Sequence, residues 1–130
     1  MALVPTLTIN DTTTFSDTVN FSVTDSLTAA APAQALSLVN ATATGSASII
    51  VPATTSIVYL FVRHTGTTDG STGTAQLVDV EFTTDEAVAR LGAGEWLFMP
   101  ISHAAADVGV QLQVNHASVV QMEYAYWTKG

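Results

Sequence analysis

Val120-Gln-Met-Glu-Tyr-Ala-Tyr126 alternates apolar and polar residues almost without interruption, and it runs on into Trp127-Thr-Lys-Gly130. Successive side chains of a β-strand point to opposite faces, so this run predicts a strand that lines one buried and one wetter face of a sheet. The same alternation is present in Val108-Gly-Val-Gln-Leu-Gln-Val-Asn115, which predicts a second strand of this kind. The last third of the sequence therefore indicates a β-protein.

The two faces of the first run carry different side chains. If Tyr124 and Tyr126 lie inward, then Glu123, Ala125 and Trp127 share the opposite face. A large indole so near the end of the sequence is an unusual side chain to leave in water. We therefore expect a contact with another subunit on the face that carries Trp127.

Further strands are predicted by alternation or by short apolar runs between turn residues. They cover residues 2–9, 19–27, 36–38, 48–51, 57–62, 77–82 and 95–99. Ile57–Val62 is continuously apolar, which predicts a central strand that is buried on both faces. In Leu77–Phe82 the alternation predicts that the valines and Phe82 point inward, while Asp79 and Glu81 point outward.

Two segments between these strands carry local signals of their own. Thr65–Thr74 is rich in Gly, Ser and Thr and contains Asp69-Gly70, so it predicts an exposed, mobile tip between two strands. Thr83–Gly92 is the one helix candidate, because Thr83 and Glu86 stand at capping-box spacing. This helix would have barely two turns, and packing determines the conformation of so short a segment. A strand is therefore the alternative interpretation.

Nine or ten strands at this spacing are typical of sandwiches and jelly rolls. Residues 29–40 are interpreted as a loop followed by a strand. We predict an all-β, two-layer antiparallel β-sandwich, jelly-roll-like, with at most one short helix near residues 84–91. A chain of 130 residues fits a single domain spanning 1–130 with its own core. Residues 1–9 are either an extended N-terminal arm or an edge strand of that domain.

Charge is scarce and mostly negative. Charged residues make up 11% of the chain, against roughly 25% in typical soluble domains. A surface with so little charge suggests partial coverage by neighbouring subunits. Eleven acidic residues face three scattered bases, Arg63, Arg90 and Lys129, for a net charge of −8. This balance disfavours nucleic acid and anionic membranes as partners, because both require clustered bases.

The residues offer no motif for catalysis or for metal binding. The histidines, His64, His103 and His116, lack the spacing that brings metal ligands together, so we expect them to bond to the backbone. The acidic residues between Asp69 and Glu86 contain no calcium-loop pattern and predict a solvated face. There is no cysteine and no Gly-x-Ser-x-Gly elbow. We predict no enzymatic activity, no catalytic residue, no metal site and no cofactor.

Four aromatic residues near the end of the sequence allow two interpretations. Trp96, Tyr124, Tyr126 and Trp127 form either a sugar-stacking platform or, as we favour, core packing together with an interface aromatic. Alternation favours the second interpretation, because it separates Trp127 from the two tyrosines. A carbohydrate-binding β-sandwich is kept as an alternative function. An enzyme would need His103, Asp107 and His116 to meet within hydrogen-bonding reach.

Two segments and the composition resemble a known class of proteins. The segments are Leu91-Gly-Ala-Gly-Glu-Trp-Leu-Phe-Met-Pro100 and Val119-Val-Gln-Met-Glu-Tyr-Ala-Tyr-Trp-Thr128. Together with an acidic, cysteine-free chain rich in Thr, Ser, Ala and Val, they resemble small virion structural proteins of tailed bacteriophages. Within that class the chain is most similar to capsid decoration, or cement, proteins. Tail and fibre-associated proteins share these features and are the alternative.

The resemblance implies a non-enzymatic subunit on the surface of the virion, made in the host cytoplasm. Such a subunit forms a dimer or trimer and binds the major capsid protein. Because copies with a charge of −8 repel one another, their contacts are expected to be apolar or matched to basic patches. The interface candidates are Leu3, Val4, Leu7, Ile9, Trp96 and Trp127. The first four belong to Ala2–Ile9, which is either an arm that adds to a partner's sheet edge or an edge strand.

Overall fold

The computed structural model describes residues 6–10, 18–22, 27–31, 37–43, 47–102 and 108–129. These ranges contain eleven strands and no helix. The strands are β1 (Thr6–Asn10), β2 (Thr18–Ser22), β3 (Leu27–Ala31), β4 (Ser37–Ala43), β5 (Ser48–Val51), β6 (Val58–His64), β7 (Val78–Phe82), β8 (Ala87–Leu91), β9 (Trp96–Ile101), β10 (Val110–Val114) and β11 (Val120–Lys129). The predicted all-β class is therefore confirmed.

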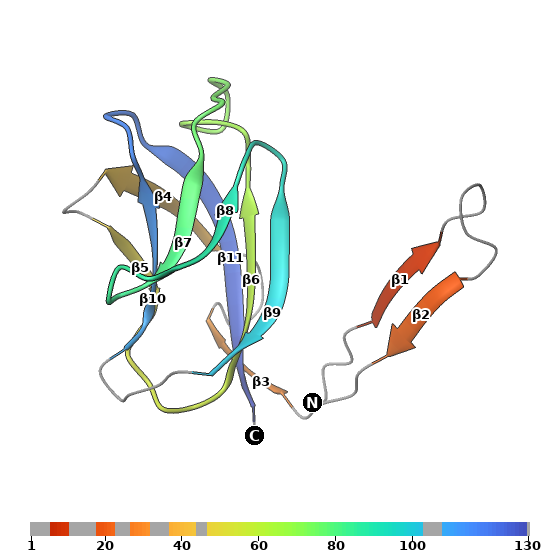
Figure 1. Ribbon diagram of the computed structural model, residues 1–130. Helices are drawn as coiled ribbons and strands as arrows, with labels where there is room; N and C mark the ends of the chain where they lie inside the picture. Colours follow the sequence, from red (N-terminus) through yellow and green to blue (C-terminus); the bar gives the residue numbers. More distant parts are fainter. Residues whose placement is uncertain are drawn as a thin grey trace.

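Nine of the strands form one sheet that folds into two layers (Figure 1). Its path is β8-β7-β10-β4-β11-β6-β9, with β3 added beside β11 and β5 beside β10. Strand β4 belongs to both layers, since Ser37–Ala41 pair with β11 while Thr42 and Ala43 pair with β10. The β4–β10 pair is parallel and the other described pairs are antiparallel, so the sandwich is mixed.

Strand β11 lies inside its layer over its whole length. One edge pairs with β6 from Met122 to Thr128. The other edge pairs first with β4 and then with β3, with a register shift between Tyr126 and Trp127. The predicted strand at the end of the sequence is thus confirmed, and its backbone hydrogen bonds are satisfied from three neighbours.

The core lies between the inner faces of the two layers. It is made of small and medium aliphatic side chains with one methionine: Ala41, Ile50, Val51, Val58, Leu60, Val62, Val78, Val80, Leu91, Ile101, Val110, Leu112, Val114, Val120 and Met122. Tyr124 and Tyr126 pack against this cluster, which confirms that they point inward. Burial raises the pKa of the Tyr126 phenol, and neighbouring Tyr124 adds to the shift. Interdigitating residues from two inner faces are the ordinary core of a sandwich.

The helix candidate is wrong, and the alternative strand is confirmed. Phe82 and Glu86 close a turn through the bond from the Phe82 N–H to the Glu86 carbonyl oxygen, 2.9 Å long. Asp85 takes a φ of 66° within this turn. The chain then returns as β8, which pairs with β7 and places Leu91 in the core. Sheet pairing and apolar burial outweigh a marginal capping signal in so short a segment.

Glu81 shares the predicted outward side of β7 with Asp79 but is buried there. Val78 and Val80 are buried as predicted, but Glu81 is only 6% exposed instead of facing solvent. Its Oε1 accepts a bond of 2.8 Å from the side-chain amide of Gln111 on β10, and the β7–β8 register shifts between Val80 and Glu81. A local bulge and a neutral donor account for the burial, because a buried carboxylate must be hydrogen-bonded.

Strand boundaries differ from the expected ones in two further places. β9 continues through Pro100 to Ile101 instead of ending before the proline, which is tolerated because β9 lies at the edge of the sheet path. The strand expected over residues 19–27 is described as β2, with Leu27 already in β3, and Ala29–Ala31 are strand where a loop was expected. Residues 23–26 and 32–36 lie outside the described ranges.

Gly109 provides a test of the contact between the start of β10 and the chain after β5. A Cβ added to Gly109 would collide with the Val51 carbonyl oxygen and approach backbone atoms of Pro52 and Ala53 to 3.0 Å. We expect Gly109→Ala to lower the free energy of unfolding by about 2 kcal/mol or more, since backbone atoms cannot step aside. Chemical denaturation measures the change.

Gly73→Ala is the matched control, because nothing lies within 4 Å of its added Cβ. This variant is expected to stay within about 0.5 kcal/mol of the wild type. Equal stabilities for the two variants would contradict the close approach at Gly109.

Candidate functional site

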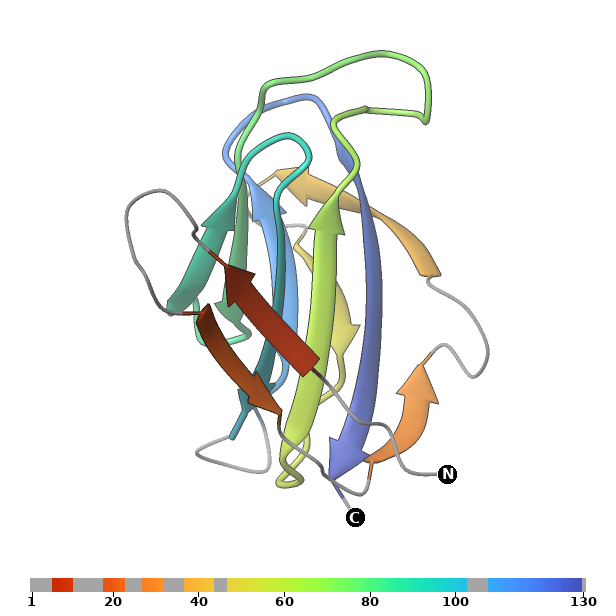
Figure 2. The ribbon, with the colours of Figure 1, turned by 90° about the vertical axis from the view of Figure 1, so that its right-hand side faces the viewer.

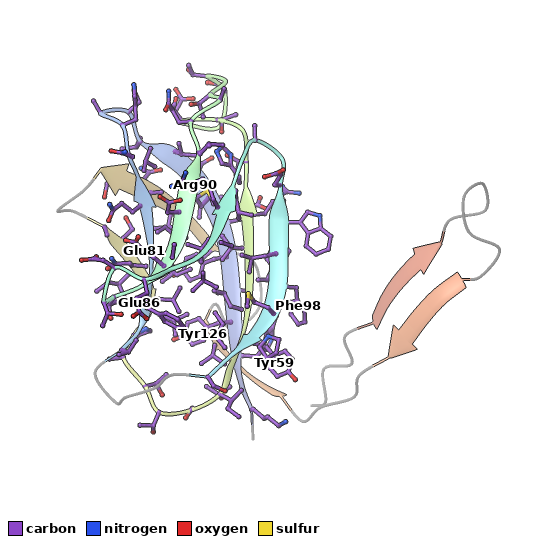
Figure 3. The ribbon with its side chains drawn as sticks, in the orientation of Figure 1. Tyr59, Glu81, Glu86, Arg90, Phe98 and Tyr126 are labelled. Carbon is purple, nitrogen blue, oxygen red and sulfur yellow. The ribbon has the colours of Figure 1, made fainter. Side chains whose placement is uncertain are left out.

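A group of aromatic residues lies on the outside of the β9–β6–β11 layer. It consists of Tyr59, Phe61, Trp96, Phe98 and Trp127, and we call it the outer aromatic face. Figure 3 shows Tyr59 and Phe98 on the outer side of the layer and Tyr126 within the body. The layer is thus apolar on both sides, although only one side faces the core.

Strand register assembles this face in rows that run across the strands. Phe98 lies opposite Phe61, which lies opposite Ala125. In the next row on the same side, Tyr59 lies between Pro100 and Trp127. Directly opposed residues of antiparallel strands share a side of the sheet, so residues far apart in the sequence become neighbours.

The rings of the outer aromatic face pack against one another at one end, and the ring at the other end is exposed to solvent. The ring centroids of Tyr59 and Phe98 are 5.9 Å apart, and those of Phe98 and Trp127 are 6.0 Å apart. The interplanar angles of 40° and 62° are those of tilted and edge-on contacts. Tyr59 is 8% exposed, whereas Trp96 at the sheet edge is 58% exposed. An indole so open beside packed aromatic rings is the feature of a contact surface.

An ion pair lies on this side of the layer. Arg63 Nε lies 2.9 Å from Glu123 Oε2, in the row that begins with Trp96. The same row ends on β4 at Leu38, which is 59% exposed. An internally neutral ion pair flanked by two exposed apolar side chains lowers the cost of removing water from this side.

In the hairpin of β1 and β2, the register separates apolar and polar residues onto different sides. Its register places Leu7 opposite Phe21 and Ile9 opposite Val19. These four residues therefore share one side of the hairpin, which we call the apolar side, while the other side carries Thr, Asn and Ser. The two strands form a separate two-stranded sheet and pair with none of the other described strands.

His64 is buried and bonded to the backbone through both ring nitrogens. Its Nδ1 accepts a bond of 2.9 Å from the Gly66 N–H, so Nε2 carries the proton and donates to the Gln76 carbonyl oxygen at 2.8 Å. His116 Nδ1 accepts from the Ser118 N–H at 3.1 Å. These two histidines therefore have the backbone roles that were predicted, while His103 and Asp107 lie outside the described residues.

The other polar cluster joins Gln111 to two carboxylates. Its amide donates to Glu81 and, over 3.1 Å, to Asp85 Oδ1. Within the described ranges, no group of three or more His, Cys, Asp or Glu residues is placed to hold a metal ion. The arrangement satisfies hydrogen-bonding groups around a turn and brings no nucleophile to a base.

Residues 65–74 form the expected exposed tip, and hydrogen bonds cross it. The two oxygens of Asp69 accept bonds from the N–H and hydroxyl groups of Ser71 and Thr72. These bonds, led by the Thr72 N–H and then the Ser71 N–H, lower the pKa of Asp69 to about 2. The Thr65 N–H donates to the Gln121 carbonyl oxygen, and the Gln121 N–H donates to the Thr67 carbonyl oxygen. Both bonds attach the start of the segment to β11. The turn signal at Asp69-Gly70 thus corresponds to a hydrogen-bonded turn.

The predicted interface residues fall into three groups. Leu7 and Ile9 lie on the apolar side of the hairpin, and Trp96 and Trp127 lie on the outer aromatic face. Leu3 and Val4 lie outside the described residues. Tyr124 and Tyr126 point to the core, so the four aromatic residues considered as a sugar platform are split between two sides of the layer.

Sequence analysis missed Tyr59, Phe61 and Phe98 as members of the face. The alternation of β9 already placed Trp96 and Phe98 on one side, and this signal could have identified Phe98. Tyr59 and Phe61 were hidden in a continuously apolar run, which has no alternation to show which side is outward.

No protein-family model matches the chain, and no curated protein or solved structure matches it. In the described part of the chain there is no helix long and apolar enough to cross a membrane.

Phe98 and Trp96 provide a matched pair for the structural and exposed parts of the face. Phe98→Ala removes a ring that contacts both Tyr59 and Trp127, and we expect a loss of about 1–3 kcal/mol in the free energy of unfolding. Trp96→Ala removes a mostly exposed ring and should cost less than about 0.5 kcal/mol at low protein concentration. A larger loss for Trp96→Ala than for Phe98→Ala would contradict this division.

The lowered pKa of Asp69 gives the tip a defined response to pH. The folded-state pKa of Asp69 is below the ordinary value of 3.8. Above pH 3.8 the carboxylate is therefore ionised and accepts all its bonds from Ser71 and Thr72. They are lost as the pH falls through about 2. A carbon-13 NMR titration of the Asp69 carboxyl group is expected to show a midpoint near 2, and a midpoint near 3.8 would contradict the hydrogen-bonded turn.

Proposed function

We propose that this chain is a non-enzymatic structural protein that works through protein–protein contacts on its outer aromatic face. The observation that carries the proposal is Trp96, 58% exposed at the margin of packed aromatic rings. Aromatic side chains are enriched in protein interfaces, where charged residues are depleted. A net charge of −8 also favours contacts made through uncharged surfaces such as this one.

The specific form that we propose is decoration of a phage capsid by an oligomer of this chain. The support is the resemblance of residues 91–100 and 119–128 to virion proteins. These segments cover most of β9 and β11, which flank β6 and supply Trp96, Phe98 and Trp127 to the outer aromatic face. The partner is the major capsid protein, and the location is the virion surface. A role in the phage tail or its fibres is the alternative within the same class.

Cosedimentation with capsids tests this proposal. The full chain is mixed with undecorated capsids assembled from the major capsid protein of the same virus. We expect the wild type to pellet with capsids and to stay in solution alone. Trp96→Ser is expected to weaken capsid binding by about tenfold or more, as loss of an interface hot spot does.

Ile49→Ser is the matched control. Ile49 is 61% exposed and pairs with Gln111 in the other layer, so its loss should leave capsid binding unchanged. A folded wild-type protein that does not pellet with capsids would overturn the decoration proposal. Binding to a glycan array that Trp96→Ser abolishes would replace it with a carbohydrate-binding function, although the rings of Tyr59, Phe98 and Trp127 meet at angles and offer no single flat platform.

A further inference from the structure

The β1–β2 hairpin is a small sheet with one side that requires a cover. An isolated two-stranded hairpin is marginally stable in water, and independent stability needs a third strand or packing against an apolar surface. The cross-strand register gathers Leu7, Ile9, Val19 and Phe21 on a single side. Such an arrangement is the pattern of a sheet that packs on something else.

We propose that the hairpin of one copy docks its apolar side on the outer aromatic face of a second copy, and that the second copy returns the same contact. This inference rests on the proposed function, in which the outer aromatic face is a contact surface. The exchange joins two copies through two identical contacts, as a two-fold symmetric interface requires. The unit that decorates a shell would then be a dimer.

The placement of the two surfaces supports this exchange. Figure 1 shows the hairpin standing apart from the body, on the side of β9. Figure 2 shows it on the side from which β6, β9 and β11 are seen. In one copy, therefore, the hairpin extends away from the layer while Trp96 stays uncovered. A hairpin that extends away from its own chain is placed to reach a neighbour.

The attachment point of the hairpin lies at the border of the face. β3, the next strand along the chain, pairs with β11 so that Ala29 lies opposite Trp127 and Leu27 lies opposite Lys129. Only residues 23–26 separate β2 from this point. The arm of each copy therefore leaves its body beside the outer aromatic face, so that two copies brought face to face would have each arm near the other's face.

Charge favours a second copy of this chain as the occupant. The ten strand residues of the hairpin carry no charge, and the ion pair beside the outer aromatic face neutralises itself. Two copies with a charge of −8 each repel elsewhere on their surfaces, so these two surfaces are suited to bring them together. A strongly basic partner would gain nothing from either surface.

Sedimentation velocity over a range of concentrations tests the exchange with four charge-matched variants of the full chain. Phe21→Asp alters the apolar side of the hairpin, and Trp96→Asp alters the outer aromatic face. Asn20→Asp, on the other side of β2, and Ile49→Asp, on the other layer, are the controls. We expect dimers for the wild type and the controls, and at least tenfold weaker dimerisation for Phe21→Asp and Trp96→Asp.

Mixing the two weakened variants distinguishes exchange between copies from docking within one copy. In a mixed dimer, the intact hairpin of Trp96→Asp meets the intact face of Phe21→Asp, so one of the two contacts is restored. We expect the equimolar mixture to dimerise more tightly than either variant alone. If each hairpin covered its own face, mixing would restore nothing, and that result would overturn the proposal.

Trp96 fluorescence provides a second measurement. The chain has two tryptophans, so Trp127→Phe leaves Trp96 as the sole reporter. Quenching of Trp96 by acrylamide is expected to fall as concentration drives dimer formation. A wild type that stays monomeric, or a dimer that persists in both Phe21→Asp and Trp96→Asp, would overturn the exchange.

The failures of the two proposals are separable. A monomer that still pellets with capsids through Trp96 overturns the exchange and leaves decoration standing. A dimer that depends on Phe21 and Trp96 but does not bind capsids supports the hairpin exchange and overturns the decoration proposal.

Discussion

The pairing of β11 along both edges is the constraint on which the rest of the structure depends. β6 holds one edge, and β4 and β3 divide the other. Its register fixes which side chains enter the core and which line the outer aromatic face. A slip of one residue would exchange Tyr124 and Tyr126 for Glu123 and Ala125 on the core side. The inner and outer surfaces of the layer are thus set by one choice of register.

Periodic patterns predicted the fold well, and tertiary contacts decided where they failed. The alternation in β10 and β11 gave their sides correctly because their inward residues are apolar and belong to the core. Residues 83–92 were predicted as a helix candidate because the capping signal can be read from neighbouring residues. Their pairing with β7 decides the structure, and that contact cannot be read from the segment itself. The burial of Glu81 was not predicted because its neutral donor, Gln111, comes from another strand. The members of the candidate site were only partly predicted, since cross-strand rows depend on registers that a sequence does not display.

The β9–β6–β11 layer has an apolar surface on each side. A strand with aliphatic residues inward and Tyr59 and Phe61 outward resembles a strand from the middle of a three-layer protein. Here the described chain supplies only two layers. The exposure of Trp96 at the edge of this layer gives the outer aromatic face its functional interest. The two hairpin strands, whose ten residues carry no charge, are the part of the chain whose chemistry matches it.

The pairing of Leu27 with Lys129 also shapes the route to the folded state. This contact closes a loop that contains most of the chain, and the β4–β10 pair joins segments that are nearly as distant. Each such closure requires conformational entropy to be lost before the contact stabilises anything, so folding through these strands is intrinsically slow. During that interval β6, which is apolar from Val58 to Val62, lacks its β11 neighbour and is open to association with other chains. The order in which strands pair therefore decides between correct assembly and aggregation.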